Sequence, residues 1–297
     1  MPSLAPPPQL FDRALIASRL DRAIRAGRGE GADFLLRRAA EELEERLSVV
    51  SRDFAVAADI GTPGPHAAEV LAARRGGGVT LRLAPTRLSS GGGNFLRAIG
   101  DVERLPLATQ GFDLIVSLLA LHHVNDLPGA LIQIRAALRP DGLLLAALIG
   151  GETLTELRQS LVVAESEVTG GAAPRVSPFA DVRALGAVLQ RAGFALPVVD
   201  VDRVVVRYGD LGGLMRDLRA FGATNALSAR RRTPLRRDVL GRAAAVYAER
   251  FADSDGRLRA TFETLWLSGW APHGSQPKPL KPGSAAMRLE DALKRTL

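Results

Sequence analysis

Three short apolar runs constrain the fold more than any other feature of this chain. They are AVAADI at 55–60, FDLIVSLL at 112–119 and LLLAALI at 143–149. Each run is nearly continuous in apolar residues, which is typical of a strand that is buried on both faces. Helical patterns at 66–75 and 127–138 separate the runs. This alternation predicts a doubly wound α/β fold, in which helices cover both faces of a mostly parallel sheet.

Hydrophobic periodicity and the positions of glycine and proline place the remaining elements. Further helices are expected at 10–26, 34–50, 153–168 and 181–192, and further strands at 79–83, 196–200 and 203–208. The last two strands almost adjoin and predict a closing hairpin or antiparallel pair. Residues 94–100 suit a third short strand or the end of a helix. The chain beyond 209 is expected to be helical, with a loop rich in proline and lysine, PHGSQPKPLKPGSA.

These elements divide the chain into three parts. Residues 1–50 are expected to form a helical N-terminal extension. Residues 51–208 are expected to form the α/β domain, with a helical insertion at about 151–193. Residues 209–297 are expected to form a helical C-terminal cap.

Composition excludes several classes of site and of location. The chain has 297 residues and no cysteine, so disulfides, thiolate metal sites and a cysteine nucleophile are excluded. It has four histidines, and we expect no metal site. No apolar run reaches the length of a membrane span, and the opening MPSLAPPPQLFDR does not resemble a signal peptide. These features predict a cytoplasmic protein.

The net charge of +7 comes mostly from arginine, because only three of the 39 basic residues are lysine. Codon usage in a GC-rich genome explains this bias. No basic stripe is interleaved with aromatic residues, so we expect no nucleic-acid partner. The runs Arg230–Arg232 and Arg236–Arg237 suit either a solvated loop and helix start or a patch that docks a partner. An attraction to anionic partners or to a membrane surface stays open.

The turn after the first predicted strand, Asp59–Gly64, has the character of a ligand site. Ligands of doubly wound folds bind at the carboxyl ends of the strands, where glycine lets the backbone approach closely. The turn lacks the spacing G-x-G-x-x-G, so it does not predict a dinucleotide site. An acid at the end of a strand, followed by glycines, suits a ligand that carries a positive amino group.

Four segments then occur in a characteristic order: GDVERLPL at 100–107, GFDLIVS at 111–117, LHHVND at 121–126 and LRPDGLL at 138–144. This order resembles the class I methyltransferases that depend on S-adenosylmethionine (AdoMet), and the resemblance implies a Rossmann-like domain. It implies that Asp101 holds the adenine amino group beside Val102, and that Asp59, Gly61 and Gly64 line the methionine end. We assign Ile60, Thr62, Ser117 and His122 to the same cofactor site.

The chain departs from that family in two places. Pro63 and Pro65 stand where the family has its second and third glycines, and proline removes a backbone donor. The family also expects an acid after the second strand to bind the ribose hydroxyls, yet residues 70–100 contain five arginines and no acid. A lost charge-assisted hydrogen bond of this kind costs about 1.5–3 kcal/mol, so weak AdoMet binding is expected.

The second half of the chain resembles one particular family within this superfamily. Its segments are GGETLTELRQSL at 150–161, VSPF at 176–179, DLRAFGATN at 217–225 and HGSQ at 273–276. With the opening LFDR, they resemble mitochondrial complex I assembly factor 5 and its bacterial relatives. This resemblance implies modification of an arginine in a protein substrate, a complex I subunit, at the periphery of the membrane. Hydroxylation needs an oxygen-activating cofactor, and the adjacent His122 and His123 are a poor pair of metal ligands.

Four residues are candidates for catalysis: His123, Glu152, Glu156 and Arg158. His123 follows the ligand end of the fourth strand, and the other three begin the helix where this fold places its lid. An acidic lip there would suit an arginine substrate through bidentate pairing. Acids in a first helical turn are also ordinary partners of the helix dipole, and His123 would equally suit a packed loop.

Two other functions remain open. One is an AdoMet-dependent methyltransferase that acts on a small molecule or on a carboxyl group bound to an acyl carrier. The other is a non-catalytic assembly scaffold with a degenerate AdoMet site, which Pro63, Pro65 and the acid-free stretch favour.

Overall fold

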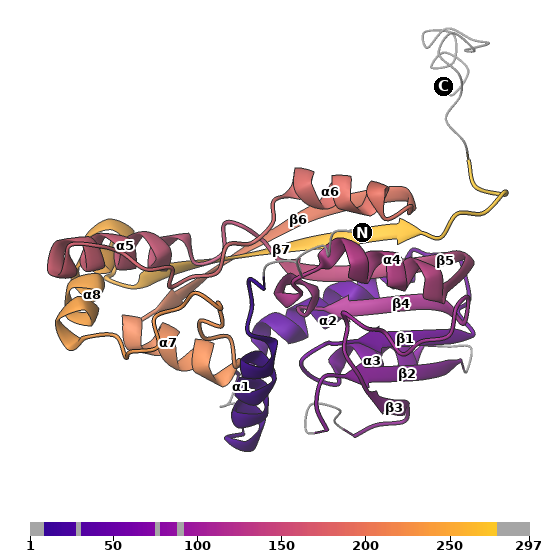
Figure 1. Ribbon diagram of the computed structural model, residues 1–297, viewed down its shortest axis with the longest axis horizontal. Coiled ribbons are helices and arrows are strands. Elements are labelled where there is room, and N and C mark those ends of the chain that lie inside the picture. The colour runs from indigo at the N-terminus through magenta and orange to yellow at the C-terminus, as the bar shows by residue number, and fades with distance from the viewer. Residues whose placement is uncertain (1–8, 28–30, 75–77, 88–91, 278–297) are drawn as a thin grey trace, which may run out of the picture.

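A seven-stranded sheet organises the computed structural model, which describes residues 9–27, 31–74, 78–87 and 92–277 (Figure 1). The strand order is β3-β2-β1-β4-β5-β7-β6. Neighbours from β3 to β5 are parallel, while β7 is antiparallel to both β5 and β6. The doubly wound, mostly parallel α/β fold is therefore confirmed. The strands are β1 (Val56–Ile60), β2 (Val79–Ala84), β3 (Leu96–Ile99), β4 (Phe112–Leu118), β5 (Leu138–Ile149), β6 (Ala195–Tyr208) and β7 (Leu258–Trp270).

Helices lie on both faces of this sheet. They are α1 (Arg13–Arg25), α2 (Phe34–Ser48), α3 (His66–Ala73), α4 (Leu127–Ala137), α5 (Thr155–Thr169), α6 (Val182–Arg191), α7 (Leu211–Ala220) and α8 (Arg237–Phe251). Leu114 and Val116 pack with α2 and α3 on one face, whereas Ile115 packs with α4 and α6 on the other. Alternate residues of one strand thus enter two separate cores, which is why the strand sequences are continuously apolar.

A third core lies away from the parallel strands. Figure 1 shows β6 and β7 extending beyond the α/β body to α5, α7 and α8. There, apolar residues of α5, α7 and α8 pack against Leu258, Ala260 and Phe262 of β7. The second half of β7 pairs with β5, from Thr264 opposite Ile149 to Trp270 opposite Leu143. One strand therefore joins the sheet to the C-terminal helices.

Two expectations about the C-terminal half need correction. The hairpin predicted at 196–200 and 203–208 is wrong, because these residues form the single strand β6. The helical region after 209 contains α7 and α8 as expected, but it also contains the unpredicted strand β7. The two errors have one cause: β7 provides a continuous partner for β6, from Val198 opposite Ser268 to Tyr208 opposite Leu258.

One further expectation agrees with the structure, and two others concern residues that the structure does not describe. Residues 94–100 contain the short strand β3 rather than a helix end. The proline-rich start at 1–8 and the loop from 278 onward lie outside the described residues. Within the described ranges, none of the helices combines the length and the apolar character needed to cross a membrane.

Candidate functional site

A buried ion pair occupies the carboxyl ends of β1 and β2. Asp59 and Arg82 stand opposite each other in the parallel register, and both side chains are completely buried. Arg82 donates one hydrogen bond to the carboxylate of Asp59 and a second, of 2.9 Å, to the backbone oxygen of Thr62. The Thr62 hydroxyl donates to the other oxygen of Asp59. We call these three residues the β1–β2 edge.

The bonds within the β1–β2 edge use the polar atoms that were expected to face a ligand. Burial raises the pKa of Asp59 to about 6, while Arg82 and Thr62 oppose this rise. The Thr62 hydroxyl also accepts a 3.0 Å hydrogen bond from the backbone of Leu118. Asp59 therefore anchors β2 and the following turn to β1, and its carboxylate is not directed at a ligand.

The turn from Gly61 to Gly64 is closely packed against neighbouring side chains. Gly61 has φ +74° and donates a 2.8 Å hydrogen bond to the backbone oxygen of Leu83. A Cβ atom on Gly61 would lie 2.8 Å from Val102 Cγ1, so only glycine fits. Ser117 donates to the backbone oxygen of Ile60 at 2.8 Å. A Cβ atom on Gly64 would lie 2.8 Å from His66 Nδ1.

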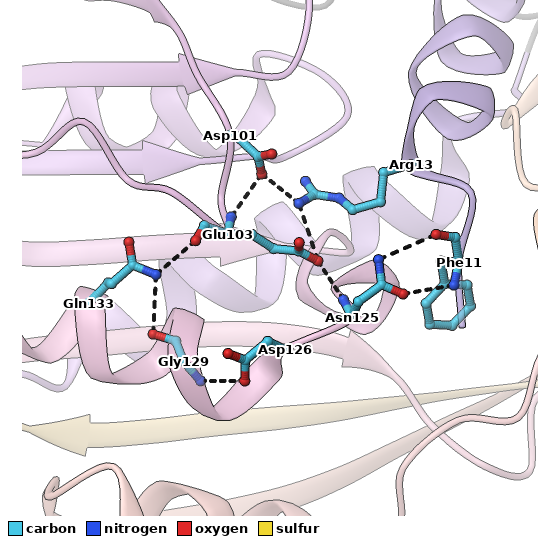
Figure 2. Close-up of polar contacts among 8 residues, drawn as sticks. All are labelled: Phe11, Arg13, Asp101, Glu103, Asn125, Asp126, Gly129 and Gln133. Atoms are coloured by element: carbon cyan, nitrogen blue, oxygen red, sulfur yellow. Dashed lines mark hydrogen bonds and ion pairs between the residues drawn. The ribbon is translucent and has the colours of Figure 1, made fainter. Parts of the chain in front are cut away.

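Asp101, the expected adenine contact, is held by the N-terminal segment (Figure 2). Its Oδ1 accepts a 2.5 Å hydrogen bond from Arg13 and a 2.8 Å bond from the backbone of Glu103. Arg13 lies 3.2 Å from Glu103 Oε1, and Glu103 accepts from the backbone of Asn125. Asn125 in turn accepts a 2.8 Å bond from the backbone of Phe11. The chain before α1 is thus fastened across this end of the sheet.

These contacts test whether the residues present fit AdoMet. The Asp59 carboxylate is engaged by Arg82 and Thr62, and Asp101 is paired with Arg13. The residue that ends β2 is the buried Ala84, which has no carboxylate for the ribose hydroxyls. Pro63 has no backbone N–H for the carboxylate of the ligand. The residues therefore do not fit the set of contacts that the resemblance implies, and we derive no step through AdoMet.

A cavity of about 320 Å³ lies beside this region, between the sheet and the C-terminal helices. Its walls are mostly apolar side chains of α1, α2, α5, α7, α8 and β7. Nine of the lining residues have polar side chains, and these are Asp33, His122, His123, Thr153, Arg175, Ser177, Arg219, Thr224 and Asn225. We call this space the central cavity.

His122 and His123 bring two adjacent imidazole rings, tilted by 48° to each other, to the cavity. Their ring centroids are 4.1 Å apart, and they lie in a short 3-10 turn (Leu121–His123) that follows β4. His122 also contacts Phe179, and His123 contacts Phe11, with centroid distances of 5.7 and 5.4 Å. Burial lowers the pKa of His122 well below its usual value. Burial, with repulsion from Arg13, lowers the pKa of His123 to about 4. Both rings are therefore neutral at pH 7.

The other three catalytic candidates do not line the central cavity. Glu156 is buried, and its carboxylate accepts from the backbone, at 3.1 Å, and from the hydroxyl of Thr261. Arg158 donates to the backbone oxygens of Gly151 and Thr153, at 3.0 and 3.2 Å. Glu152 is exposed. The structure thus leaves His123 at the cavity and places the expected acidic lip elsewhere.

Sequence reasoning missed several lining residues. Ser177 and Phe179 belong to the quoted segment VSPF, and seven lining residues belong to DLRAFGATN at 217–225. These two segments, which helped to carry the resemblance, therefore meet around one cavity, although no site was assigned to them. No sequence signal pointed to Asp33 or Arg175. In the described part of the chain, no three His, Asp or Glu side chains gather as metal ligands.

Comparisons with known proteins agree with this architecture. A methyltransferase domain family matches residues 60–146. The mitochondrial arginine-hydroxylase NDUFAF5 of Danio rerio is 40% identical over 296 residues, which cover 96% of this chain and 90% of that protein. A malonyl-[acyl-carrier protein] O-methyltransferase of Methylovorus sp. is 35% identical over 284 residues, covering 91% and 93%.

A solved structure supports the fold alone. The YcgJ protein of Bacillus subtilis aligns with a TM-score of 0.54 at 15% identity and covers 80% of this chain and 99% of its own. The sequence relatives assign the chain to a family. It belongs to the family of methyltransferase-fold proteins that includes the NDUFAF5 arginine hydroxylases.

Proposed function

We propose that this protein modifies an arginine side chain of a protein substrate and thereby supports the assembly of respiratory complex I. The relatives named as arginine hydroxylases support the reaction class. The observation that carries the proposal is the central cavity, with apolar walls and two half-buried neutral imidazoles.

An arginine side chain matches these two properties of the cavity. Its aliphatic stem packs on apolar side chains, whereas its guanidinium needs hydrogen-bond acceptors. A neutral imidazole provides one acceptor nitrogen, while a protonated one would only donate and would repel the cation. Burial keeps His122 and His123 neutral, and Asp33 is the acidic residue among the described residues that line the cavity. In this proposal His123 binds and orients the guanidinium.

A comparison of strains tests this proposal. Complex I isolated from wild-type cells should contain an arginine whose mass is raised by the modification, and a strain lacking this protein should contain the unmodified residue. Mass spectrometry of the subunits measures both. Complementation with His123→Ala should leave the arginine unmodified. The matched control is His273→Ala, because His273 is exposed and does not line the cavity. Identical arginine masses in the two strains would refute the proposal.

We propose that AdoMet binds this chain only weakly. The β1–β2 edge and Asp101 are paired internally, and each missing charge-assisted hydrogen bond costs about 1.5–3 kcal/mol. Calorimetric titration with AdoMet and S-adenosylhomocysteine should therefore give no saturable heat in the micromolar range. Micromolar binding that Asp101→Ala abolishes would contradict this expectation.

The malonyl-carrier methyltransferase relatives favour a second candidate, transfer of a methyl group to a carrier-bound carboxylate. The apolar walls of the cavity would accept an acyl chain equally well. A methyl-transfer assay with malonyl carrier protein and AdoMet distinguishes the two candidates. It detects a methyl ester on the carrier, whereas the arginine reaction is detected by the mass of a complex I subunit. Labelled methyl ester in this assay would favour the second candidate.

The same proposal places the protein in the cytoplasm, beside the peripheral arm of complex I. Cell fractionation measures this, with release from membranes at high salt expected for a peripheral association.

A further inference from the structure

A second cleft, lined by arginines, adjoins the central cavity. It has a volume of about 590 Å³, and its basic residues are Arg19, Arg175, Arg230, Arg231 and Arg232. We call it the arginine cleft. Arg175, Thr224 and Asn225 line both spaces, so the cleft and the cavity share one wall. A molecule that extends along this wall therefore contacts both.

The cleft holds more positive charge than its own carboxylates balance. Arg230 pairs with Asp12 at 3.1 Å, and Arg175 pairs with Glu165 at 2.5 Å. Among the described residues, no carboxylate lies within ion-pair distance of Arg19, Arg231 or Arg232, and the last two are exposed. The cleft is therefore a site of positive potential that attracts anions.

Arg19 is repelled by neighbouring arginines. It is half-buried and donates to the backbone oxygens of Thr224 and Asn225, at 2.8 and 2.5 Å. Burial lowers its pKa, and repulsion from Arg230 and Arg22 lowers it further. Asp12 supplies some opposite charge but does not cancel this repulsion, and a further carboxylate in the cleft would relieve it.

We propose that the arginine cleft binds acidic residues that flank the modified arginine in the protein substrate. This inference rests on the proposed function, since it places the arginine in the central cavity and its neighbours across the shared wall. Carboxylates accept paired hydrogen bonds from a guanidinium, which gives position as well as affinity. Among the described residues that line the cleft none is aromatic, which disfavours nucleic acid because base stacking needs an aromatic platform.

Peptide binding to the whole 297-residue chain tests this inference. The probes are a fluorescent peptide with a central arginine flanked by Asp and Glu, and its counterpart with Asn and Gln at those positions. Anisotropy should show that the acidic peptide binds and that the amide counterpart binds at least about tenfold more weakly. The affinity should fall as the salt concentration rises. Equal affinities for the two peptides would overturn the inference.

Two double variants from the same basic run locate the site. Arg231→Gln with Arg232→Gln should weaken binding of the acidic peptide about tenfold, because both side chains line the cleft. Arg236→Gln with Arg237→Gln removes the same charge from exposed positions that do not line it, and should leave the affinity within about twofold. Equal losses in the two variants would show a general charge effect and would overturn the inference.

Two further results separate this inference from its alternatives. Binding of phosphatidylglycerol vesicles that depends on Arg231 and Arg232, without binding of the acidic peptide, would assign the cleft to a membrane surface and overturn the inference. Peptide binding is measured without any reaction. If arginine masses depend on the protein but the acidic peptide does not bind, the inference fails while the proposed function stands. If the peptide binds but the strains have identical arginine masses, the proposed function fails instead.

Discussion

The carboxyl end of the sheet contains two regions that differ in how they satisfy their polar groups. At the β1–β2 edge, Asp59, Thr62 and Arg82 bind one another, and no side chain there is left to meet a ligand. In the central cavity, the walls are apolar and the two imidazoles contact each other mainly through their rings. The polar groups of the first region hydrogen-bond to one another. In the second region Nδ1 of His122 accepts a 3.5 Å hydrogen bond from the backbone of Ile149, and His123 is the imidazole that we propose as the acceptor for a ligand. Position at the end of a strand is thus not enough to identify a binding site.

Breaking the ion pair of the β1–β2 edge should have the largest effect. Arg82→Met removes one partner and leaves a buried carboxylate, so the free energy of unfolding should fall by about 3–5 kcal/mol. Urea denaturation measures it. Adding Asp59→Leu to this variant should recover most of the loss, because an apolar pair replaces the buried charges. A loss below about 1 kcal/mol in Arg82→Met would show that Asp59 is not held by this pair.

Acid should destabilise the cavity region through His123. Its pKa is about 4 when folded and about 6.5 when unfolded. The stability that the neutral ring contributes is therefore complete above pH 6.5 and is lost as the pH falls to 4, an effect of about 3 kcal/mol. Asp59 has the opposite sign, because burial raises its folded pKa to about 6.

For this reason the measurement compares the wild type with His123→Gln, which retains the Asp59 contribution. The difference in their unfolding free energies should change by about 3 kcal/mol between pH 7 and pH 4, to the disadvantage of the wild type. A constant difference across this range would mean that the folded protein does not depress the pKa of His123.

Filling the central cavity should separate stability from function. Leu157→Phe places a larger side chain in the cavity wall and should raise stability by about 1 kcal/mol while abolishing arginine modification. The matched control is Leu47→Phe, at a buried position that does not line the cavity. The control should lose about 1–3 kcal/mol through overpacking. Thermal unfolding and the mass-spectrometric assay measure the two effects, and full modification by Leu157→Phe would remove the cavity from the mechanism.

The smallest effect is expected for the exposed ion pair near the β1–β2 edge. Arg13→Gln breaks the contact with Asp101, whose side chain is 51% exposed. Such pairs contribute less than about 1 kcal/mol, and salt screens them. Urea unfolding at low and high salt checks this. A loss as large as that of Arg82→Met would mean that the N-terminal segment is essential to the fold.

Sequence alone was sufficient for the parallel strands β1, β2, β4 and β5, while it left β3 open between a strand and a helix end. Each inner strand is apolar on both faces, because alternate residues enter separate cores, and this leaves a continuous apolar run that needs no distant information. The departures from the AdoMet-binding pattern could also be read from the sequence, because Pro63 and the absence of acids at 70–100 involve only consecutive residues. Among the residues around the central cavity, His122 and His123 had been named as candidates, whereas those of VSPF and DLRAFGATN were visible only as quoted segments with no assigned place.

Tertiary structure decided the features that depend on partners far along the chain. Strand β6 is continuous because β7, which begins 50 residues after β6 ends, pairs along it. Glu156 is structural because Thr261 binds its carboxylate. Arg82 could be seen as one of five arginines, but only the register of β2 on β1 places it beside Asp59. The local sequence pattern therefore determined which segments of the parallel sheet are strands. Strand register and long-range pairing determined which charged groups pair within the protein and which can bind a ligand.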